Sequence, residues 1–435
     1  MTPLPPAGGR ALVVGVGRSG LALAHFLAGR DIRVRAVDAR PAEKLGEALA
    51  ALPPDTEVVT GGHGRETLDG CQAVFASPGV PWDAPLLQEA RDRGLPVSSE
   101  IDLFFGLCPG DVVGVTGTNG KTTTTAMIGA VLAQGERPVA VGGNIGETVL
   151  DRLAELTPDH WVVLELSSFQ LESCSRPHAR IGAVLNVTPD HLDRHGTLER
   201  YVDAKARLVE ALDADGVAIL NGEDPICREL ARRTSGRVVW FDEHRPVPAI
   251  PVPGRHNELN ALAAAAVGRA AGLRDEQIQA GLADFRSVEH RLELVGEWGG
   301  VRWFNDSKAT NPDAGLVALR SFPGVPLVLI AGGHGSGFEL DVWEEEVRRS
   351  TAAVVLMGES APELEQRLAG HSVHRVESLA EAVDTAGALA RPGGVVLLSP
   401  AYKSYDMFRS YEERGRLFKD AVRSRNQAGT DPERE

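Results

Sequence analysis

The stretch Gly114-Val-Thr-Gly-Thr-Asn-Gly-Lys-Thr-Thr124 follows the apolar run 112–115 and precedes a run with apolar residues at 127, 128, 131 and 132. A strand, a glycine-rich turn with a lysine and a hydroxyl residue, and a helix form the layout of a nucleoside-triphosphate site. The glycines let backbone N–H groups face phosphate oxygens, and the helix N-terminus adds positive potential. Lys121 would reach the terminal phosphates, and Thr122 would bind Mg2+. Val115 stands where the strict pattern has glycine, so an ordinary glycine-rich turn stays open as the alternative.

The composition indicates an acidic globular protein. The chain has 435 residues, of which 43% are hydrophobic and 24% charged, which fits a globular protein of about two to four domains. Its formal net charge of −15 would repel a nucleic-acid backbone, so nucleic acid is not expected as a partner. Its four cysteines are widely spaced, and no stretch reaches the roughly 18 apolar residues of a membrane span. We therefore expect reduced thiols, a cytoplasmic location, no membrane partner and a monomeric chain.

Residues 1–98 are predicted to form a Rossmann-like domain. A buried strand over 11–16 leads into Gly15-Val-Gly-Arg-Ser-Gly20 and a helical run, and a second strand over 33–37 ends at Asp38. Together they match the glycine fingerprint with an acidic residue about 20 positions further on. The motif is either a nucleotide-phosphate site or a tight strand–helix turn. A further strand from 73 ends in Ser77-Pro-Gly79, at the same edge of the predicted sheet.

Residues 99–286 contain the phosphate loop and two further buried strands, 161–166 and 183–187. Both strands end in polar loops, and ligands of a parallel sheet bind beyond the carboxyl ends of its strands. We therefore expect the three loops to converge. Glu165 is then a candidate Mg2+ ligand, although a lone carboxylate there also serves as a helix cap. His191 has no cysteine nearby, which gives a zinc site little support, and Lys205 by itself reads as a surface lysine on a helix.

Residues 287–435 begin with a predicted hairpin over 292–304 and continue with strands at 327–330, 353–357 and 395–398. Strands that alternate with helices indicate a third parallel sheet, and the polar tail after Lys419 is expected to be disordered. The predicted fold class is α/β with three domains: an N-terminal Rossmann-like domain, a central P-loop ATPase-like parallel sheet and a C-terminal Rossmann-like domain.

Further motifs follow the phosphate loop in a fixed order. They are Gly-Thr-Asn-Gly-Lys-Thr at 117–122, Gly-Gly-Asn-Ile-Gly at 142–146, Leu-Glu-Leu-Ser-Ser-Phe-Gln-Leu-Glu at 164–172, Asn-Val-Thr-Pro-Asp-His-Leu-Asp-Arg at 186–194, Tyr-x-x-x-Lys-x-Arg at 201–207, Gly-x-His-Asn-x-x-Asn at 254–260, His290-Arg291, Asn-Asp-Ser-Lys-Ala-Thr-Asn at 305–311 and Leu-Ser-Pro-Ala-x-x-Ser-x-Asp-x-Phe at 398–408. The chain thereby resembles the Mur ligases, ATP-dependent amide-forming enzymes of peptidoglycan precursor synthesis, over about residues 11–418. Within that family, the segment 167–172 favours the member that adds D-glutamate.

The resemblance implies an amide ligation. ATP would phosphorylate the carboxylate of UDP-N-acetylmuramoyl-L-alanine, D-glutamate would attack the acyl phosphate, and ADP and phosphate would leave. The implied cofactors are ATP, one or two Mg2+ ions and a CO2-derived carbamate that turns Lys205 into a metal ligand. The implied process is peptidoglycan synthesis and, through it, cell wall biogenesis, cell shape and cell division.

The resemblance also implies roles for individual residues. The catalytic residues would be Lys121, His191, Lys205 and Lys308, and the metal ligands Thr122, Glu165, His191 and Lys205. ATP would be bound by Gly117, Thr118, Asn119, Gly120, Lys121, Thr122, Thr123, Asn257, Asn260, Arg291 and Asp306. The UDP substrate would be bound by Arg18, Ser19, Asp38, Arg40, Ser77, Gly79, Asn144 and His191, and D-glutamate by Thr310, Ser404 and Tyr411. Residues 1–98 would thus bind UDP and 99–286 ATP, while 287–435 would bind the amino acid and close on ATP.

Two positions depart from the family pattern. Ala39 stands where close relatives often carry Thr, which puts one uracil contact in doubt. After Gly332-Gly333, relatives have a Lys that meets a D-glutamate carboxylate, whereas this chain reads His334-Gly-Ser-Gly-Phe338. Lys403 is a candidate replacement for that lysine.

Three other interpretations stay open. An NAD-dependent oxidoreductase would leave the phosphate loop and Glu165 unexplained. A non-catalytic relative would not need Lys121, Glu165, His191 and Lys205 together. A third is a sibling ligase that adds another amino acid, but the N-terminal Rossmann-like block argues against the folate-polyglutamating enzyme.

Overall fold

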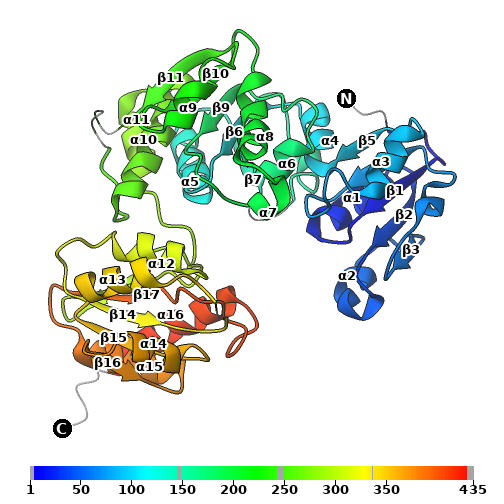
Figure 1. Cartoon of the computed structure of the whole chain (residues 1–435). Helices are drawn as coiled ribbons and strands as arrows, with labels where there is room; N and C mark the ends of the chain where they lie inside the picture. The colour runs from blue at the N-terminus through cyan, green and yellow to red at the C-terminus, as the bar shows by residue number, and fades with distance from the viewer. Residues whose placement is uncertain are drawn as a thin grey trace. The chain divides into compact units, whose positions relative to one another are not determined.

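The computed structural model describes residues 4–144, 148–242, 244, 246, 248–335 and 337–428 (Figure 1). The chain divides into two compact units, Met1–Ala249 with Leu259–Ala283, and Ile250–Glu258 with Asp284–Glu435. The first unit carries two parallel sheets, and the second carries one mixed sheet. The predicted α/β class is confirmed. Parts of the predicted motifs, namely 145–146, 336 and 429–435, lie outside the described residues.

The first sheet is built on β1 (Arg10–Val14), an apolar strand with a neighbour on each side. The strand order is β3-β2-β1-β4-β5, and every pairing is parallel. Ala11 and Val13 pack into one buried cluster and Leu12 and Val14 into another, because both faces of the sheet are covered. The other strands are β2 (Arg33–Asp38), β3 (Glu57–Thr60), β4 (Ala73–Ala76) and β5 (Val97–Ser99). The helices are α1 (Arg18–Ala28), η1 (Ala42–Lys44), α2 (Gly46–Ala50), η2 (Arg65–Leu68), α3 (Pro85–Asp92) and α4 (Glu100–Leu107).

The second sheet has the order β11-β10-β9-β6-β8-β7, again wholly parallel. Its central strand, β6 (Asp111–Thr116), leads into the phosphate loop, and its neighbours are β8 (Trp161–Glu165) and β9 (Ile181–Val184). The three candidate loops therefore leave adjacent strands. The outer strands are β7 (Val139–Gly143), β10 (Val217–Asn221) and β11 (Arg237–Phe241). The helices are α5 (Lys121–Leu132), η3 (Leu153–Glu155), α6 (Ser168–Glu172), α7 (Leu192–His195), α8 (Leu198–Glu210), α9 (Pro225–Leu230), α10 (Arg255–Ala270) and α11 (Asp275–Ala283).

The third sheet, with the order β12-β13-β17-β14-β15-β16, was expected to be parallel but is mixed. The predicted hairpin is present: Gly299 and Gly300, with φ of 61° and 74°, join β12 (Glu293–Trp298) to β13 (Val301–Asn305). A two-residue turn forces its strands to be antiparallel, so β12 forms an antiparallel edge on five parallel strands. The other strands are β14 (Leu327–Ala331), β15 (Ala353–Leu356), β16 (Val373–Arg375) and β17 (Val395–Leu398). The helices are α12 (Pro312–Leu319), α13 (Asp341–Ser350), α14 (Ala361–Arg367), α15 (Leu379–Leu389) and α16 (Tyr411–Ala428).

The segment after Lys419 is helical rather than disordered as far as residue 428. Phe418 and Val422 of α16 are fully buried in the core beside the third sheet. Because the segment is mostly polar, its composition did not indicate that Phe418 and Val422 anchor the helix in the core.

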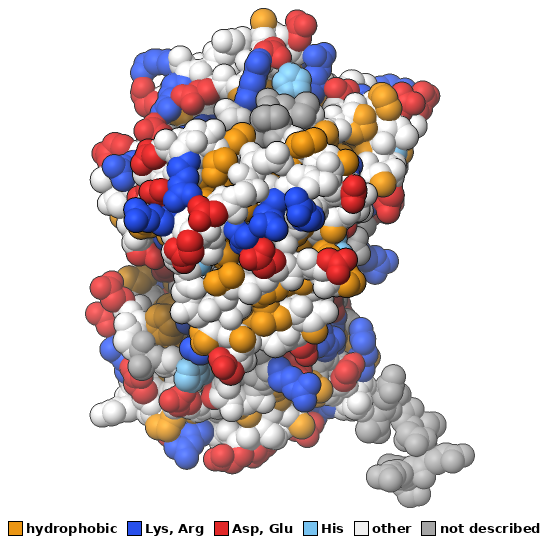
Figure 2. All heavy atoms as spheres, turned by 90° about the vertical axis from the view of Figure 1, so that its right-hand side faces the viewer, with side chains coloured by type: hydrophobic (Ala, Val, Ile, Leu, Met, Phe, Trp, Pro, Cys, Tyr) orange, Lys and Arg blue, Asp and Glu red, His pale blue; other side chains and the backbone are white. Residues whose placement is uncertain are grey.

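The surface carries charges of both signs. On the face drawn in Figure 2, Lys and Arg side chains lie interspersed with Asp and Glu, without a continuous basic strip of described residues. Within the described ranges, no helix combines the length and apolar character needed to cross a membrane.

Candidate active site

The phosphate loop connects β6 to α5 at the carboxyl end of the second sheet. Gly117 and Gly120 have φ of 156° and 82°, conformations that residues with a side chain rarely adopt, so these glycines set the turn. The loop after β9 holds it: Thr118 N donates to Asn186 O at 2.9 Å, and Asn119 N donates to Asn186 Oδ1 at 2.8 Å. The predicted convergence of these two loops is confirmed.

Glu165 ends β8 on the other side of β6, and only 2% of its surface is exposed. Its Oε1 accepts a hydrogen bond from Asn144 Nδ2 at 3.1 Å, while its Oε2 is buried without a hydrogen-bond partner among the described residues. A buried carboxylate oxygen without a partner is costly unless a cation or a donor completes it. The chemistry of this position therefore fits the predicted Mg2+.

A metal ion at Glu165 would need ligands from outside the usual metal-binding side chains. Among the described residues, no group of three or more His, Cys, Asp or Glu is arranged to hold a metal ion. The remaining ligands would come from hydroxyl groups such as that of Thr122, from a modified lysine and from nucleotide oxygens.

Lys205 lies on α8 with 1% of its surface exposed, so its interpretation as a surface lysine is wrong. Its Nζ donates to Gly117 O at 2.7 Å and lies 4.5 Å from the centre of the Tyr201 ring. Lys121 Nζ donates to the same carbonyl at 3.1 Å, so two lysines meet at one turn of the phosphate loop. Burial, assisted by the positive charge of Lys121, lowers the pKa of Lys205 to about 7. A substantial fraction of this amine is therefore neutral and nucleophilic near pH 7.

Two histidines follow β9, and the structure distinguishes them. The side chain of His191 is 50% exposed, and its Nε2 lies 3.5 Å from Asp190 Oδ2. His195 is buried: its Nε2 lies 3.0 Å from Ser168 Oγ and its ring stacks on Phe169 with the centroids 5.2 Å apart. Burial lowers the pKa of His195 below its usual range. His191 is thus the more exposed of the two histidines, and its predicted ligand role stays a prediction, while His195 packs against Phe169 and supports the loop.

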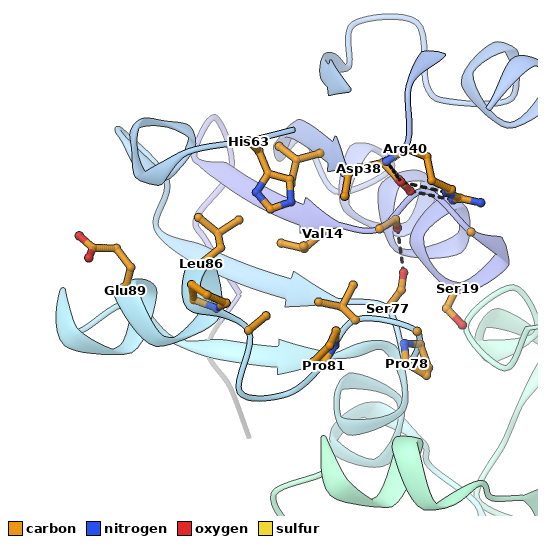
Figure 3. Close-up of a pocket in the computed structure, with 18 of the residues that line it drawn as sticks. Val14, Ser19, Asp38, Arg40, His63, Ser77, Pro78, Pro81, Leu86 and Glu89 are labelled. Carbon is orange, nitrogen blue, oxygen red and sulfur yellow. Dashed lines mark hydrogen bonds and ion pairs between the residues drawn. The ribbon is translucent and has the colours of Figure 1, made fainter. Parts of the chain in front are cut away.

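A pocket of about 1000 Å3 opens in the first domain (Figure 3). Loops that follow β1, β2, β3 and β4 line it, as expected for the carboxyl edge of a parallel sheet. Of the eight residues predicted for the UDP substrate, all but His191 line this pocket: Arg18, Ser19, Asp38, Arg40, Ser77, Gly79 and Asn144. The sequence did not single out His63, Arg65, Pro81, Leu86 and Glu89, which also line it.

The pair of Asp38 and Arg40 organises one end of the pocket. Asp38 Oδ2 accepts from Val16 N at 2.8 Å and from Arg40 Nη2 at 2.7 Å, and Oδ1 accepts from Arg40 Nε at 2.9 Å. The hydrogen bonds from Arg40 hold the pKa of Asp38 down to about 2, against the opposite effect of burial. Asp38 is therefore ionised, and it fixes the guanidinium of Arg40 where an anion can reach it.

The first and second sheets are linked beside the pocket by side chains of the same unit. Glu100 accepts hydrogen bonds from the Ser19 side chain and from the backbone of Val149 and Leu150, and Arg194 Nη1 donates to Gly79 O at 3.1 Å. Asn144 lines the pocket and also donates to Glu165. Through Asn144, the candidate Mg2+ ligand lies directly beside the candidate substrate pocket.

In the second unit, Asp306 directly follows β13 and is buried. Its Oδ1 accepts from Leu292 N at 3.2 Å, and its Oδ2 accepts from Ser399 Oγ at 2.9 Å. Burial raises the pKa of Asp306 to about 7, although these hydrogen bonds and the charge of Arg291 act in the opposite direction. Asp306 is thus poised between its neutral and ionised forms.

Arg414 of α16 is fully buried and connects the loops that follow β13 and β17. Its Nη2 donates to Ser307 O at 2.8 Å, its Nε to Ser307 Oγ at 2.9 Å, and its Nη1 to Tyr402 O at 3.2 Å. β13 and β17 are parallel neighbours, so the guanidinium fastens two adjacent loops at one sheet edge.

The residues predicted to border D-glutamate belong to these loops and to α16. Thr310 follows β13, Ser404 follows β17 and is 2% exposed, and Tyr411 begins α16. Lys308 Nζ lies 5.5 Å from the centre of the Tyr411 ring. The tertiary structure therefore brings the predicted amino-acid residues and Lys308 to one edge of the third sheet.

The loop after β14, which lacks the lysine of the family pattern, pairs with the loop after β17. His334 N donates to Lys403 O at 2.8 Å, and His334 Nδ1 lies 2.5 Å from Glu359 Oε2. A Cβ on Gly333 would lie 2.2 Å from Lys403 O, so only glycine permits this close approach. The Lys403 side chain is exposed and makes no ion pair with any described residue. It is therefore a cation available beside Ser404.

Comparison with known proteins identifies the family. The profile of the Mur ligase MurD-like N-terminal domain matches residues 9–99, that of the Mur ligase middle domain 115–247, and that of the Mur ligase glutamate ligase domain 290–402. The UDP-N-acetylmuramoylalanine–D-glutamate ligase of Koribacter versatilis is 41% identical over 443 residues, which cover 96% of this chain and 97% of that protein. The chain belongs to the Mur ligase family.

Solved structures share the Mur ligase fold at lower identity. UDP-N-acetylmuramate-alanine ligase MurC from Thermotoga maritima has a TM-score of 0.59 and 21% identity, with 96% of this chain and 99% of that chain covered. Folylpolyglutamate synthase from Mycobacterium tuberculosis, solved in complex with ADP and AMPPCP, has a TM-score of 0.54 and 18% identity, with 71% and 91% covered. At these identities the likeness concerns the fold alone.

The predicted Mur ligase family and three-domain α/β fold are thus confirmed, while the roles of single residues stay predictions. Asn260 of α10 lies beside the phosphate loop, since a Cβ on Gly120 would come within 2.5 Å of its Oδ1. Asn257 is buried, and its Nδ2 donates to Pro253 O at 2.6 Å. Thr123 is half-buried in the first turn of α5.

Two features of this Mur ligase escaped the sequence analysis although a signal was present. All buried residues of α8 except Ala206 follow the helical spacing of three and four, so periodicity indicates that Lys205 faces inward. They are Tyr201, Ala204, Lys205, Leu208 and Val209. Ser167 and Gln170 form a capping box that begins α6 within the loop after Glu165, a pattern visible as Ser-x-x-Gln.

Proposed function

We propose that this chain is an ATP-dependent ligase that joins D-glutamate to UDP-N-acetylmuramoyl-L-alanine through an acyl phosphate. One observation carries the proposal: a phosphate loop with two lysines lies beside a carboxylate, Glu165, that is linked through Asn144 to a pocket large enough for a nucleotide. The name of the 41% identical relative, which matches nearly the whole chain, supports both substrates. These substrates place the reaction in the cytoplasm, where nucleotide sugars and ATP are supplied.

The first chemical step activates a carboxylate. Its oxygen is a poor leaving group, so amide formation first requires a bond between that oxygen and the γ-phosphorus of ATP, while the bond from phosphorus to the β–γ bridging oxygen breaks and ADP leaves. Two anions must approach each other for this step, so positive charge has to stand between them. Lys121 and the N-terminus of α5 supply it. Mg2+, when bound by Thr122 and Glu165, would neutralise the phosphate oxygens further.

The second step forms the amide. The neutral amine of D-glutamate attacks the acyl carbon, the C–N bond forms, and the nitrogen releases one proton to solvent. The C–O bond breaks with its electron pair leaving on phosphate. The residues that would hold the amino acid, Thr310, Ser404 and Tyr411, are neutral, whereas glutamate carries two carboxylates. Lys308 and Lys403 lie on the same two loops as Thr310 and Ser404, and we assign the balancing charge to them.

The proposal includes a carbamate on Lys205. CO2 adds to a neutral amine and releases a proton, and burial lowers the pKa of Lys205 enough to provide that form near pH 7. The product is carboxylate-like and would give Mg2+ an oxygen ligand beside the phosphate loop, where Lys205 Nζ lies 2.7 Å from Gly117 O.

Phosphate release with ATP, Mg2+ and UDP-N-acetylmuramoyl-L-alanine tests the function when the amino acid is varied. We expect release with D-glutamate and close to none with L-glutamate, L-alanine or no amino acid. Phosphate release with L-glutamate but not with D-glutamate would contradict the proposal. Release with L-alanine would indicate a sibling ligase.

Lys205→Ala tests the carbamate. We expect kcat to fall by at least about 100-fold, because the variant loses a metal ligand in the transition state, with partial recovery when short-chain carboxylic acids are added. Lys44→Ala, at an exposed lysine of η1, is the matched control and should keep full activity. Unchanged activity of Lys205→Ala would rule out the carbamate role.

A further inference from the structure

The pocket of the first domain has two chemically different ends (Figure 3). Asp38, Arg40, Ser19 and Ser77 lie at one end, while His63, Leu86 and Glu89 lie at the other. The walls of the pocket are lined by apolar side chains, namely Val14, Val37, Val80, Pro81 and Leu86. A polar end and an apolar slot suit the two parts of a nucleotide, its phosphates and its base.

Most polar side chains at the polar end already have hydrogen-bond partners within the protein. Asp38 is held by Arg40, Ser77 Oγ donates to Gly15 O at 2.8 Å, and Ser19 bonds to Glu100. This end combines the guanidinium of Arg40 with the N-terminus of α1, which favours anions. The phosphates of the substrate belong at the N-terminus of α1, whereas Ala39, between Asp38 and Arg40, occupies the position at which family members contact uracil.

The apolar end contains one conspicuous polar group. His63 Nδ1 is buried and has no hydrogen-bond partner among the described residues. Among the described side chains that line the pocket, His63 alone has a buried polar atom without a partner. Glu89, at the same end, is already paired with Arg93 at 2.7 Å. A buried ring nitrogen without a partner costs free energy unless a ligand completes it.

The backbone of the loop after β3 holds His63 close to the loop after β2. Gly61 and Gly62 turn the chain after β3 with φ of 77° and 130°, which glycine alone adopts easily. Gly61 N donates to Arg40 O at 2.9 Å, so the loop that carries His63 is fastened to the residue that follows Ala39, the position of the family's uracil contact. Ala39, next to Arg40, lines the pocket without a side-chain donor of its own.

We propose that His63 hydrogen-bonds the edge of the pyrimidine base of the nucleotide substrate and is a specificity-determining residue of this pocket. The inference rests on the proposed function, because it needs a uridine nucleotide as part of the substrate. A uracil edge presents two carbonyl acceptors and one N–H donor. An imidazole nitrogen can donate or accept according to its tautomer, so His63 can match either group.

Calorimetric titration of the full chain with UDP tests this role. We expect His63→Phe, which keeps a flat ring but loses the hydrogen bond, to weaken UDP binding about tenfold. His63→Gln keeps a donor and an acceptor and should stay within about threefold of the natural chain. His178→Phe makes the same change at a side chain that is 65% exposed and should bind UDP normally.

A second ligand separates base recognition from a structural role. Ribose 5-diphosphate lacks the base, so its affinity should be the same in the natural chain and in His63→Phe. The preference for UDP over CDP should also shrink in that variant. Equal UDP affinity in the two proteins, or an equal loss for ribose 5-diphosphate, would overturn the inference while leaving the proposed function intact. Failure of the natural chain to bind UDP at all would overturn both.

Discussion

At the scale of single residues, the candidate site is governed by how each buried charge is compensated. Burial moves the pKa of Lys205 down and that of Asp306 up, each to about 7, because neither has an ion-pair partner that fully offsets the loss of water. Asp38 behaves in the opposite way, since the hydrogen bonds from Arg40 lower its pKa to about 2. Both the nucleophilic amine and the half-protonated carboxyl therefore result from incomplete pairing.

Asp306→Asn should reveal the cost of burying this carboxylate as a pH dependence of stability. The pKa of Asp306 in the folded chain, about 7, lies above the ordinary aspartate value of 3.8, so the stability that the carboxyl contributes is fully present below about pH 4 and is lost as the pH rises through 7. Relative to the natural chain, the variant should therefore gain about 2 kcal/mol between pH 5 and pH 8. Calorimetric unfolding at both pH values measures this, and a gain that is equal at the two pH values would contradict the assignment.

Lys403→Ala should weaken the binding of the amino acid without affecting the nucleotide. The lysine is an exposed cation beside Ser404, and a charge-assisted hydrogen bond to a carboxylate is worth about 1.5–3 kcal/mol. We expect KM for D-glutamate to rise at least about tenfold, with KM for ATP unchanged. Lys403→Arg should recover most of the loss. If KM for D-glutamate does not change, His334 or Lys308 must carry the charge.

At the scale of elements, the site is made by the carboxyl ends of adjacent parallel strands. β7, β8, β6 and β9 are neighbours, so Asn144, Glu165, the phosphate loop and Asn186 leave one sheet edge although they are far apart in the chain. The same rule joins the ends of β13 and β17 in the second unit, where Arg414 fastens the two loops. Strand order, more than any single contact, decides which side chains meet.

Gly143→Ala should disturb the candidate site by pushing the ends of β7 and β8 apart. Gly143 ends β7 with φ of 103°, and a Cβ there would lie 2.2 Å from Glu165 O. Gly272→Ala is a matched control, because Gly272 has φ of 92° and no atom within 4 Å of its Cβ position. Both variants bear the cost of a positive φ, about 1 kcal/mol, but only Gly143→Ala should lose a further 1–3 kcal/mol, roughly, together with kcat. Denaturant unfolding and phosphate release measure the two losses, and equal values for the two variants would argue against a steric role of Glu165 O.

At the scale of the whole molecule, the residues proposed to bind the nucleotide substrate and those proposed to bind the amino acid lie in different units. The substrate pocket and the phosphate loop belong to the first unit, whereas Lys308, Thr310 and Ser404 belong to the second. The first unit has its own continuous core, formed by residues of both its sheets. It therefore satisfies the basic requirement for folding without the second unit.

A fragment of residues 1–283 should still bind UDP but should not catalyse the ligation. We expect its dissociation constant for UDP to stay within about threefold of the full chain, because all residues that line the pocket are present. It should release no phosphate, since the residues assigned to the amino acid are missing. Titration and phosphate release on the fragment, with circular dichroism as the folding control, test this. A folded fragment that fails to bind UDP would contradict the division of roles.

The strands and turns that the sequence predicted are those with strong local signals. Apolar runs such as 161–166 and 395–398 form buried central strands. The glycine patterns at 15–20 and 114–124 form the turns between β1 and α1 and between β6 and α5. Short or amphipathic edge strands, among them β3, β7 and β16, escaped prediction because too few residues carry the pattern. The polar end of the chain was misjudged for a related reason, since two apolar residues suffice to anchor α16.

The sequence alone determined the phosphate loop, the glycine fingerprint and the family motifs, because a tight turn or a helix start depends on residues within a few positions of one another. Only the tertiary structure decided that Lys205 meets Gly117 O, 88 positions away, that Glu165 keeps an oxygen without a partner, and that His63 reaches the substrate pocket. These properties depend on strand order, burial and the loss of water around a charge, which arise only when distant segments pack together.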